Sequence, residues 1–332
     1  MTLANRDLVV VLGPQPEEGE GAHSAGGMLA ELGIRGKVAL VHAGYQERES
    51  EDAAIIAALG VPTVNLRLHQ RATEVFAKDP EFSAAYQARQ QRLRHMQSFY
   101  RVRLEKTEDA ARSISVRYVD AELLEQEEKV SVDQFRQLDL DHMERCAAVR
   151  AAFLAHWRPH ERELIARHRA QLKAELADCQ ALVISGGHVA SLLNRLALFD
   201  VLDLAAGMPV LAWSAGAMVL TDRIVLFHDF PPYGSDTAQM LDAGFGRAPG
   251  IIVLPDPRRR VNLEARSGIQ RFARRMAPAT CVAMDVGAFV VFEAGRIVSA
   301  QAIRLTTTGD AEPRWDGEPS RFSTPYLRGV HV

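Results

Sequence analysis

Residues 210–218 read VLAWSAGAM, and they decide the fold that we expect for this chain. The apolar start is typical of a buried strand, and the run passes at Ser214 into the small residues that open a helix. A serine at such a turn exposes its hydroxyl, and small neighbours permit a strained backbone and close approach of a substrate. The N–H of Ala215, at the helix start, is placed to receive a developing negative charge. The stretch predicts a nucleophile elbow; the alternative is a tight strand–helix turn without chemistry.

A glycine pair ends the preceding predicted strand. The apolar run 181–185 stops at Gly186 and Gly187, and His188 follows. Glycines leave their main-chain N–H groups open to a substrate because no side chain covers them. We therefore expect this loop to lie beside Ser214 and to contribute oxyanion donors.

Apolar runs alternate with helical stretches at both ends of the chain. This alternation predicts an α/β fold, a mostly parallel sheet with helices on both faces. The other expected strands are 8–12, 37–42, 62–66, 250–254, 280–285, 288–293 and 296–305, with helices at 52–59, 189–198 and 262–276.

Between the two halves the strand signals disappear. Apolar residues there recur at steps of three and four, as from Met143 through Cys146 and Val149 to Phe153, which predicts a large helical insertion. The expected organisation is a first α/β part at 1–68, the insertion at 69–179, a second α/β part at 180–305 and an irregular segment at 306–332.

The glycine loop followed by the elbow resembles the dipeptidase E and cyanophycinase family of serine peptidases. The resemblance covers about residues 7–66 and 180–305, and it implies the class I glutamine amidotransferase-like fold. It also implies that Ser214 is the nucleophile, that Gly186 and Gly187 form the oxyanion loop, and that Asp229 is the acidic partner. Amidotransferases proper carry cysteine at the elbow, so an ammonia-producing activity is disfavoured.

The family's histidine base is missing from its expected place. Depending on where a short insertion falls, that position holds Asp256, Pro257 or Asn262. A serine without an imidazole to accept its proton is a poor nucleophile. His188, after the glycine loop, and His228, beside Asp229, are the two histidines that we expect to substitute.

Three consecutive arginines follow the predicted strand 250–254. Arg258, Arg259 and Arg260 are expected to overhang the site and to bind a carboxylate through forked hydrogen bonds, the alternative being a solvated turn.

Composition excludes several classes of protein. The chain is 47% hydrophobic and 24% charged, with a net charge of −3, and no apolar run approaches the roughly 20 residues of a membrane span. We expect no membrane or nucleic-acid partner, and a cytoplasmic location because the start lacks a secretory signal. Three cysteines without close spacing predict neither disulfides nor a zinc site. His156, His160 and His168 lack a completing ligand, so no metal or cofactor is expected.

Two functions remain open on the sequence. The first is a serine hydrolase acting on a small or acidic peptide or amide through Ser214, with weak or altered activity. The second is a catalytically silent relative that binds a ligand or a protein partner through its pocket or insertion. A homodimer is compatible with either.

Overall fold

The computed structural model of the protein describes residues 7–15, 23–227 and 237–315, and these contain one ten-stranded mixed sheet. The sheet runs in the order β3 (Thr63–Asn65), β2 (Val38–Val41), β4 (Ala181–Ile184), β5 (Val210–Trp213), β1 (Leu8–Leu12), β10 (Phe289–Glu293), β11 (Arg296–Leu305), β9 (Thr280–Met284) and β8 (Ile251–Pro255), with β12 (Ala311–Trp315) paired to β11. The strands from β3 to β1 are parallel, as are β8 and β9, whereas β10 and β11 pair antiparallel with their neighbours. The α/β fold and the mostly parallel sheet are as predicted.

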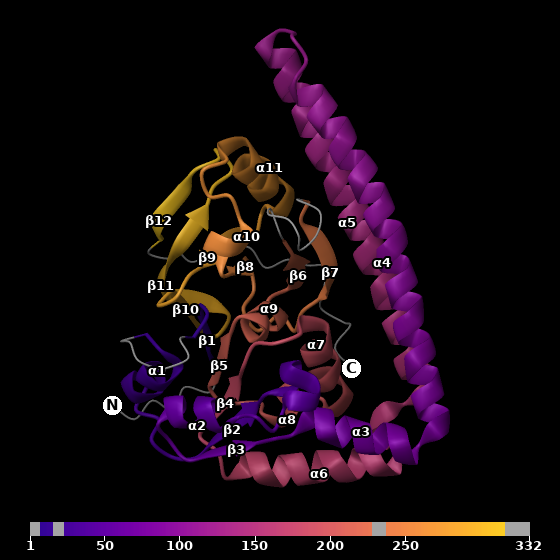
Figure 1. The fold of residues 1–332 in the computed structure, drawn as a ribbon, viewed down its shortest axis with the longest axis vertical. Coiled ribbons are helices and arrows are strands. Elements are labelled where there is room, and N and C mark those ends of the chain that lie inside the picture. Colours follow the sequence, from indigo (N-terminus) through magenta and orange to yellow (C-terminus); the bar gives the residue numbers. More distant parts are fainter. Residues whose placement is uncertain (1–6, 16–22, 228–236, 316–332) are drawn as a thin grey trace.

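The strand side chains divide between two apolar cores, because successive residues of a strand point to opposite faces. Val9 and Val11 lie in one core, and Leu8, Val10 and Leu12 in the other. Helices α1 (Ala25–Glu31) and α2 (Ala53–Leu59) cover the second core. The first core lies under α3 (Leu68–Lys78), α6 (Glu163–Ala177), α7 (Val189–Phe199), α8 (Val201–Leu204) and α9 (Ala215–Leu220). Helices therefore cover both faces of the sheet (Figure 1).

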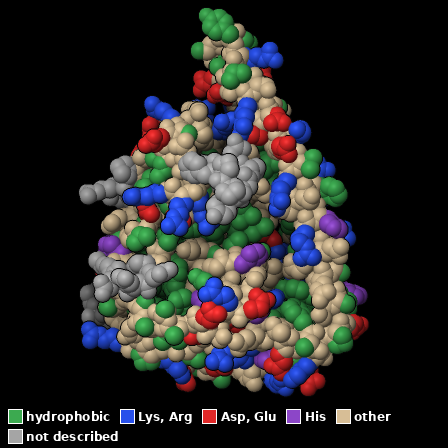
Figure 2. Space-filling model, in the orientation of Figure 1, with side chains coloured by type: hydrophobic (Ala, Val, Ile, Leu, Met, Phe, Trp, Pro, Cys, Tyr) green, Lys and Arg blue, Asp and Glu red, His purple; other side chains and the backbone are tan. Residues whose placement is uncertain are grey.

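The predicted helical insertion is dominated by two long helices, which we call the arm. The arm consists of α4 (Pro80–Ser115) and α5 (Ala121–Trp157), packed side by side. Asp79 and Asp120 cap their N-termini by accepting hydrogen bonds from Phe82 N and Leu123 N. The connected ends project beyond the rest of the molecule (Figure 1), and hydrophobic side chains lie at this tip (Figure 2). Neither arm helix, nor any other described helix, has a stretch long and apolar enough to cross a bilayer.

The arm packs on the body of the molecule at two levels. Near its base, the rings of Phe82, Tyr86, Phe153 and Trp157 stack and tilt against one another. Further along, side chains of both arm helices share a third apolar core with β8, β9 and α11 (Arg266–Met276). The insertion is thus anchored along much of its length.

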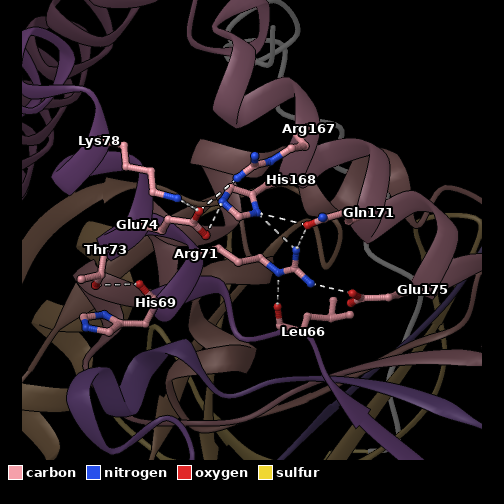
Figure 3. Close-up of polar contacts among 10 residues, drawn as sticks. All are labelled: Leu66, His69, Arg71, Thr73, Glu74, Lys78, Arg167, His168, Gln171 and Glu175. Carbon is pink, nitrogen blue, oxygen red and sulfur yellow. Dashed lines mark hydrogen bonds and ion pairs between the residues drawn. The ribbon is translucent and has the colours of Figure 1, made fainter.

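The two ends of the insertion are joined by a polar cluster between α3 and α6 (Figure 3). Arg71 donates to Leu66 O at 2.8 Å, to Gln171 Oε1 at 2.8 Å and to Glu175 Oε1 at 2.6 Å. His168 also lies in this cluster, with its Nε2 3.3 Å from Glu74 Oε2. The guanidinium therefore connects the chain entering the insertion to the chain leaving it.

Three segments differ from the sequence prediction. Residues 311–315 form β12 instead of an irregular segment, because the end of β11 pairs with β9 along one edge and leaves its other edge to β12. A two-stranded sheet of β6 (Arg223–Leu226) and β7 (Gln239–Ala243) lies where no strand was predicted. The helix predicted at 262–276 begins only at Arg266, preceded by the short α10 (Pro257–Arg260). Two 3₁₀ helices, η1 (Ala43–Arg48) and η2 (Pro159–Glu161), complete the described elements.

Candidate functional site

Ser214 occupies a strained turn between β5 and α9. Its φ of 51° and ψ of −122° lie where residues other than glycine rarely occur. Its side chain makes no capping hydrogen bond with α9, and no hydrogen bond to its Oγ forms among the described residues. Gly216 permits the turn, because a Cβ there would lie 2.4 Å from Ile184 O. The local geometry is the sharp strand-to-helix turn that a nucleophile elbow requires.

The glycine loop lies beside this serine. β4 and β5 are neighbouring parallel strands, so Gly186 and Ser214 emerge at the same edge of the sheet. A Cβ on Gly186 would lie 3.1 Å from Ser214 Cβ and 3.9 Å from Ala215 N. Gly187 has a φ of +100°, and a Cβ on it would lie 2.4 Å from Gly44 C. The structure therefore brings Gly186, Gly187, Ser214 and Ala215 together, as expected.

These residues line a cavity of about 370 Å³. Its walls come from the ends of several strands and from the segments that follow them. Besides the elbow and the glycine loop, the lining includes Gln15, Tyr45, Trp213, Phe227, Asp256 and Arg260. We call this the Ser214 cavity.

His188 does not reach Ser214. It is the N-cap of α7, and its Nδ1 accepts a hydrogen bond from Ser191 N at 3.2 Å. The residue is exposed and does not belong to the lining of the Ser214 cavity. The first expected substitute for the family histidine is therefore occupied in capping a helix. The second, His228, and the expected acid Asp229 lie outside the described residues.

The three residues considered for the expected histidine position lie in different places after β8. β8 ends at Pro255, and Asp256 follows directly in a left-handed conformation, lining the Ser214 cavity. Pro257 is buried at the start of α10, and Asn262 lines a different cavity, against α11 and the arm. Of these three residues, Asp256 alone lines the Ser214 cavity.

The three arginines separate in space. Arg260 lines the Ser214 cavity. Arg258 pairs with Asp285 through its Nε, and Arg259 Nε lies 3.9 Å from Asp256 Oδ2. Arg258 and Arg259 do not belong to the lining of the Ser214 cavity, and their side chains are 80% and 84% exposed, as in the alternative of a solvated turn.

A buried histidine that no sequence pattern singled out, His42, lies at the same edge of the sheet. His42 Nδ1 lies 2.8 Å from Ser185 Oγ, and Ser185 Oγ donates to Val41 O at 3.1 Å. Since that hydroxyl proton is committed to Val41, His42 Nδ1 is the donor to Ser185. The ring of His42 stacks on Tyr45, which lines the Ser214 cavity, at 4.0 Å between centroids. Its place directly after an apolar run was the available signal.

The protein should lose stability as the pH falls below about 6.5. Burial is the main cause that lowers the pKa of five described histidines, namely His42, His69, His142, His160 and His168. Between the lowered pKa and the unfolded value of about 6.5, the unfolded chain binds more protons than the folded one. The stabilisation that these neutral histidines provide is therefore complete above pH 6.5, and it disappears as the pH falls through their pKa values in the folded protein. We expect urea unfolding at pH 5.5 to give a free energy at least about 1 kcal/mol below that at pH 7.5.

Glu49 provides the control for this experiment. Burial raises the pKa of its carboxyl group, so its contribution opposes that of the histidines as pH falls. The free energy of unfolding should therefore fall more between pH 7.5 and pH 5.5 in Glu49→Gln than in the unaltered protein. Equal or greater stability at pH 5.5 in both proteins would contradict the assignment.

The histidines and cysteines considered for metal binding are dispersed. His156 packs against Trp157, His160 is in η2, and His168 lies in the α3–α6 cluster. Cys146, Cys179 and Cys281 are all free thiols. Within the described ranges, no three His, Cys, Asp or Glu side chains gather in a way that could hold a metal ion.

Comparisons with known proteins give little beyond the geometry. No protein-family model matches the chain, and no curated protein matches it in sequence. Among solved structures, the chain is similar to the crystal structure of a peptidase from an acI-B1 Actinobacterium. The two share 14% identity at a TM-score of 0.46, over 95% of this chain and 96% of the other. A likeness of this size does not decide the function.

Proposed function

We propose that Ser214 is the nucleophile of a hydrolase-like site of the dipeptidase E and cyanophycinase type, on a class I glutamine amidotransferase-like fold. The observation that carries this proposal is the strained backbone of Ser214, with φ 51° and ψ −122°, beside the Gly186 loop. Strain of this kind costs about 1–3 kcal/mol and concentrates at functional sites. The substrate class is a small peptide or amide, because the cavity of about 370 Å³ has room for little more.

The proposed reaction begins with attack of Ser214 Oγ on the carbonyl carbon of the substrate. The N–H groups of Ala215 and of the glycine loop lie beside Ser214, where they would stabilise the oxyanion. Arg260 would bind a carboxylate of the substrate, since it lines the same cavity. Asp256 is the lining residue that would accept the serine proton, and a carboxylate is a weaker base than imidazole near neutral pH. Turnover is therefore slow.

The alternative is a silent relative that binds a ligand in the Ser214 cavity. Two observations favour it: His188 caps α7, and no described histidine forms a hydrogen bond with Ser214. In that case the elbow is retained as part of a binding surface, without acyl transfer.

A fluorophosphonate probe separates these functions. We expect it to label Ser214 in the folded protein at least about tenfold faster than in the urea-unfolded chain, because the elbow exposes the hydroxyl and the loop stabilises the adduct. The labelled peptide is identified by mass spectrometry.

The matched variants are Ser214→Ala and Ser113→Ala. Ser113 is an exposed serine of the arm, and its hydroxyl donates to Asp109 O at 2.8 Å. Labelling should vanish in the first variant and persist in the second. Equal labelling of folded and unfolded protein would reject the nucleophile and favour the silent relative.

A further inference from the structure

A second cavity, of about 300 Å³, lies between the base of the arm and the body of the molecule. We call it the arm-base cavity. Its lining includes residues of α4 and α5 on the arm, and of α7, α8 and the segment after β7 on the body. Phe153, Leu154, Leu193 and Leu196 give it apolar walls. It shares no lining residue with the Ser214 cavity.

Arg89 lines this cavity and forms no ion pair with any carboxylate of the described residues. Its guanidinium carbon lies 4.3 Å from the centroid of the Tyr86 ring and 4.4 Å from that of Phe153, so two aromatic faces hold it in place. Its Nε is buried without a hydrogen bond, and its Nη2 has only a distant contact, at 3.5 Å, with Asn194 Oδ1. Burial lowers the pKa of Arg89, the effect expected for a cation removed from water.

Two more buried polar atoms in the lining have no hydrogen-bond partner in the part of the chain that the structure describes. The Tyr86 hydroxyl has no hydrogen-bond partner within the described ranges, although the residue is only 6% exposed. His160 Nε2 is likewise buried and unbonded. A buried hydroxyl without a partner costs about 1–3 kcal/mol, so a ligand that accepted its proton would be favoured.

The carboxylates of the lining interact with partners other than Arg89 and Arg247. Asp242 accepts two hydrogen bonds from Arg150 Nε, at 3.2 and 3.0 Å, and Asp200 Oδ2 lies 3.1 Å from Arg169 Nη1. Asp203, the third carboxylate of the lining, also has an interaction partner. Arg247, from the segment after β7, adds a cation that forms no ion pair with the described residues. Arg89 and Arg247 are thus cations available to an anion.

We propose that the arm-base cavity binds a small monocarboxylate with an apolar body. The Nε–H and a terminal N–H of Arg89 form the planar fork that matches a carboxylate, and the Tyr86 hydroxyl supplies a further donor. The apolar body lies against the leucine and phenylalanine walls. Bound in this way, the ligand connects the arm to α7 and α8.

Hexanoate is the probe, with 1-hexanol and hexylamine as matched neutral and cationic compounds. By ligand-observed NMR we expect hexanoate to bind with a Kd of about 1 mM, as is reasonable for so small a ligand. The alcohol and the amine should bind at least about tenfold more weakly, since neither offers two anionic oxygens. No hexanoate binding at 10 mM, or equal binding of the amine, overturns the proposal.

The variants locate the carboxylate. Arg89→Met keeps an unbranched apolar stem and should weaken hexanoate binding at least about tenfold. Arg103→Met, which alters an exposed arginine of α4 outside both cavities, should leave the affinity unchanged, and Arg260→Met reports on any binding in the Ser214 cavity. If hexanoate binding were lost in Arg260→Met but retained in Arg89→Met, the anion would lie in the Ser214 cavity, and this inference would be refuted.

Tyr86→Phe tests the same site without removing a charge. It deletes only the unpartnered hydroxyl, so the free protein should be at least as stable as before. Its affinity for hexanoate should nevertheless fall about fivefold. Unchanged affinity would show that the hydroxyl does not contact the ligand, and the proposed geometry would be wrong.

Discussion

Replacing Asp256 by histidine should raise kcat/KM for an activated aryl ester by about 100-fold, the lower end of what a positioned general base contributes. Asp256 directly follows β8 and lines the Ser214 cavity, so in the proposed function it is the place for a general base. Histidine tolerates the left-handed backbone that Asp256 adopts, with φ 56° and ψ 53°, better than most residues do. The substitution therefore introduces an imidazole into the lining of the Ser214 cavity with little change in the loop.

Three variants control this experiment. Asp256→Asn removes the carboxylate without adding a base and should not raise activity. Asn262→His introduces the same imidazole into the cavity beside α11, away from Ser214, and should leave the rate unchanged. Adding Ser214→Ala to Asp256→His should abolish the gain. A gain that survived without Ser214, or an Asp256→His enzyme no faster than the original, would refute the proposed arrangement.

Removing Asp139 should destabilise the protein by about 3–5 kcal/mol, because it leaves a buried cation without its partner. Asp139, on α5, is 5% exposed and accepts two hydrogen bonds from Arg275 of α11, both at 2.7 Å. Tyr100 OH also donates to Asp139 at 2.7 Å, and accepts from Met240 N at 3.1 Å. The Asp139→Ala variant therefore breaks a network that joins both arm helices to the body.

An exposed pair provides the comparison. Arg304 Nε and Glu312 Oε2 are also 2.7 Å apart, but their side chains are 38% and 40% exposed. Water screens such a pair, so Glu312→Ala should cost no more than about 1 kcal/mol. Free energies of unfolding from urea titration measure both. Equal losses in the two variants would show that burial of the Asp139–Arg275 pair adds nothing.

The sequence predicted the features that are encoded locally. The elbow was visible because a strained serine turn needs small neighbours, and Gly216 has no room for a Cβ. The sheet was visible because buried parallel strands read as continuous apolar runs. The insertion was visible because its core residues recur at helical spacing.

What the sequence did not predict depends on contacts between distant residues. The pairing of β6 with β7 and of β12 with β11 is set by partners along the chain and not by strong strand patterns. The role of His188 as a helix cap depends on the position of Ser191 N. The choice among Asp256, Pro257 and Asn262 depended on where β8 ends, which a sequence cannot fix to one residue.

The cluster around Arg71 has a consequence for how the chain folds. β3 and β4 both pair with β2, although roughly 115 residues separate them in the sequence. Closing a free loop of that length costs about 2 kcal/mol more entropy than closing one a tenth as long. Helices form within microseconds from local contacts, so the arm and the α3–α6 contact can assemble before the central strands align. We expect the insertion to act as a folded bridge that shortens the search for the β2–β4 pairing.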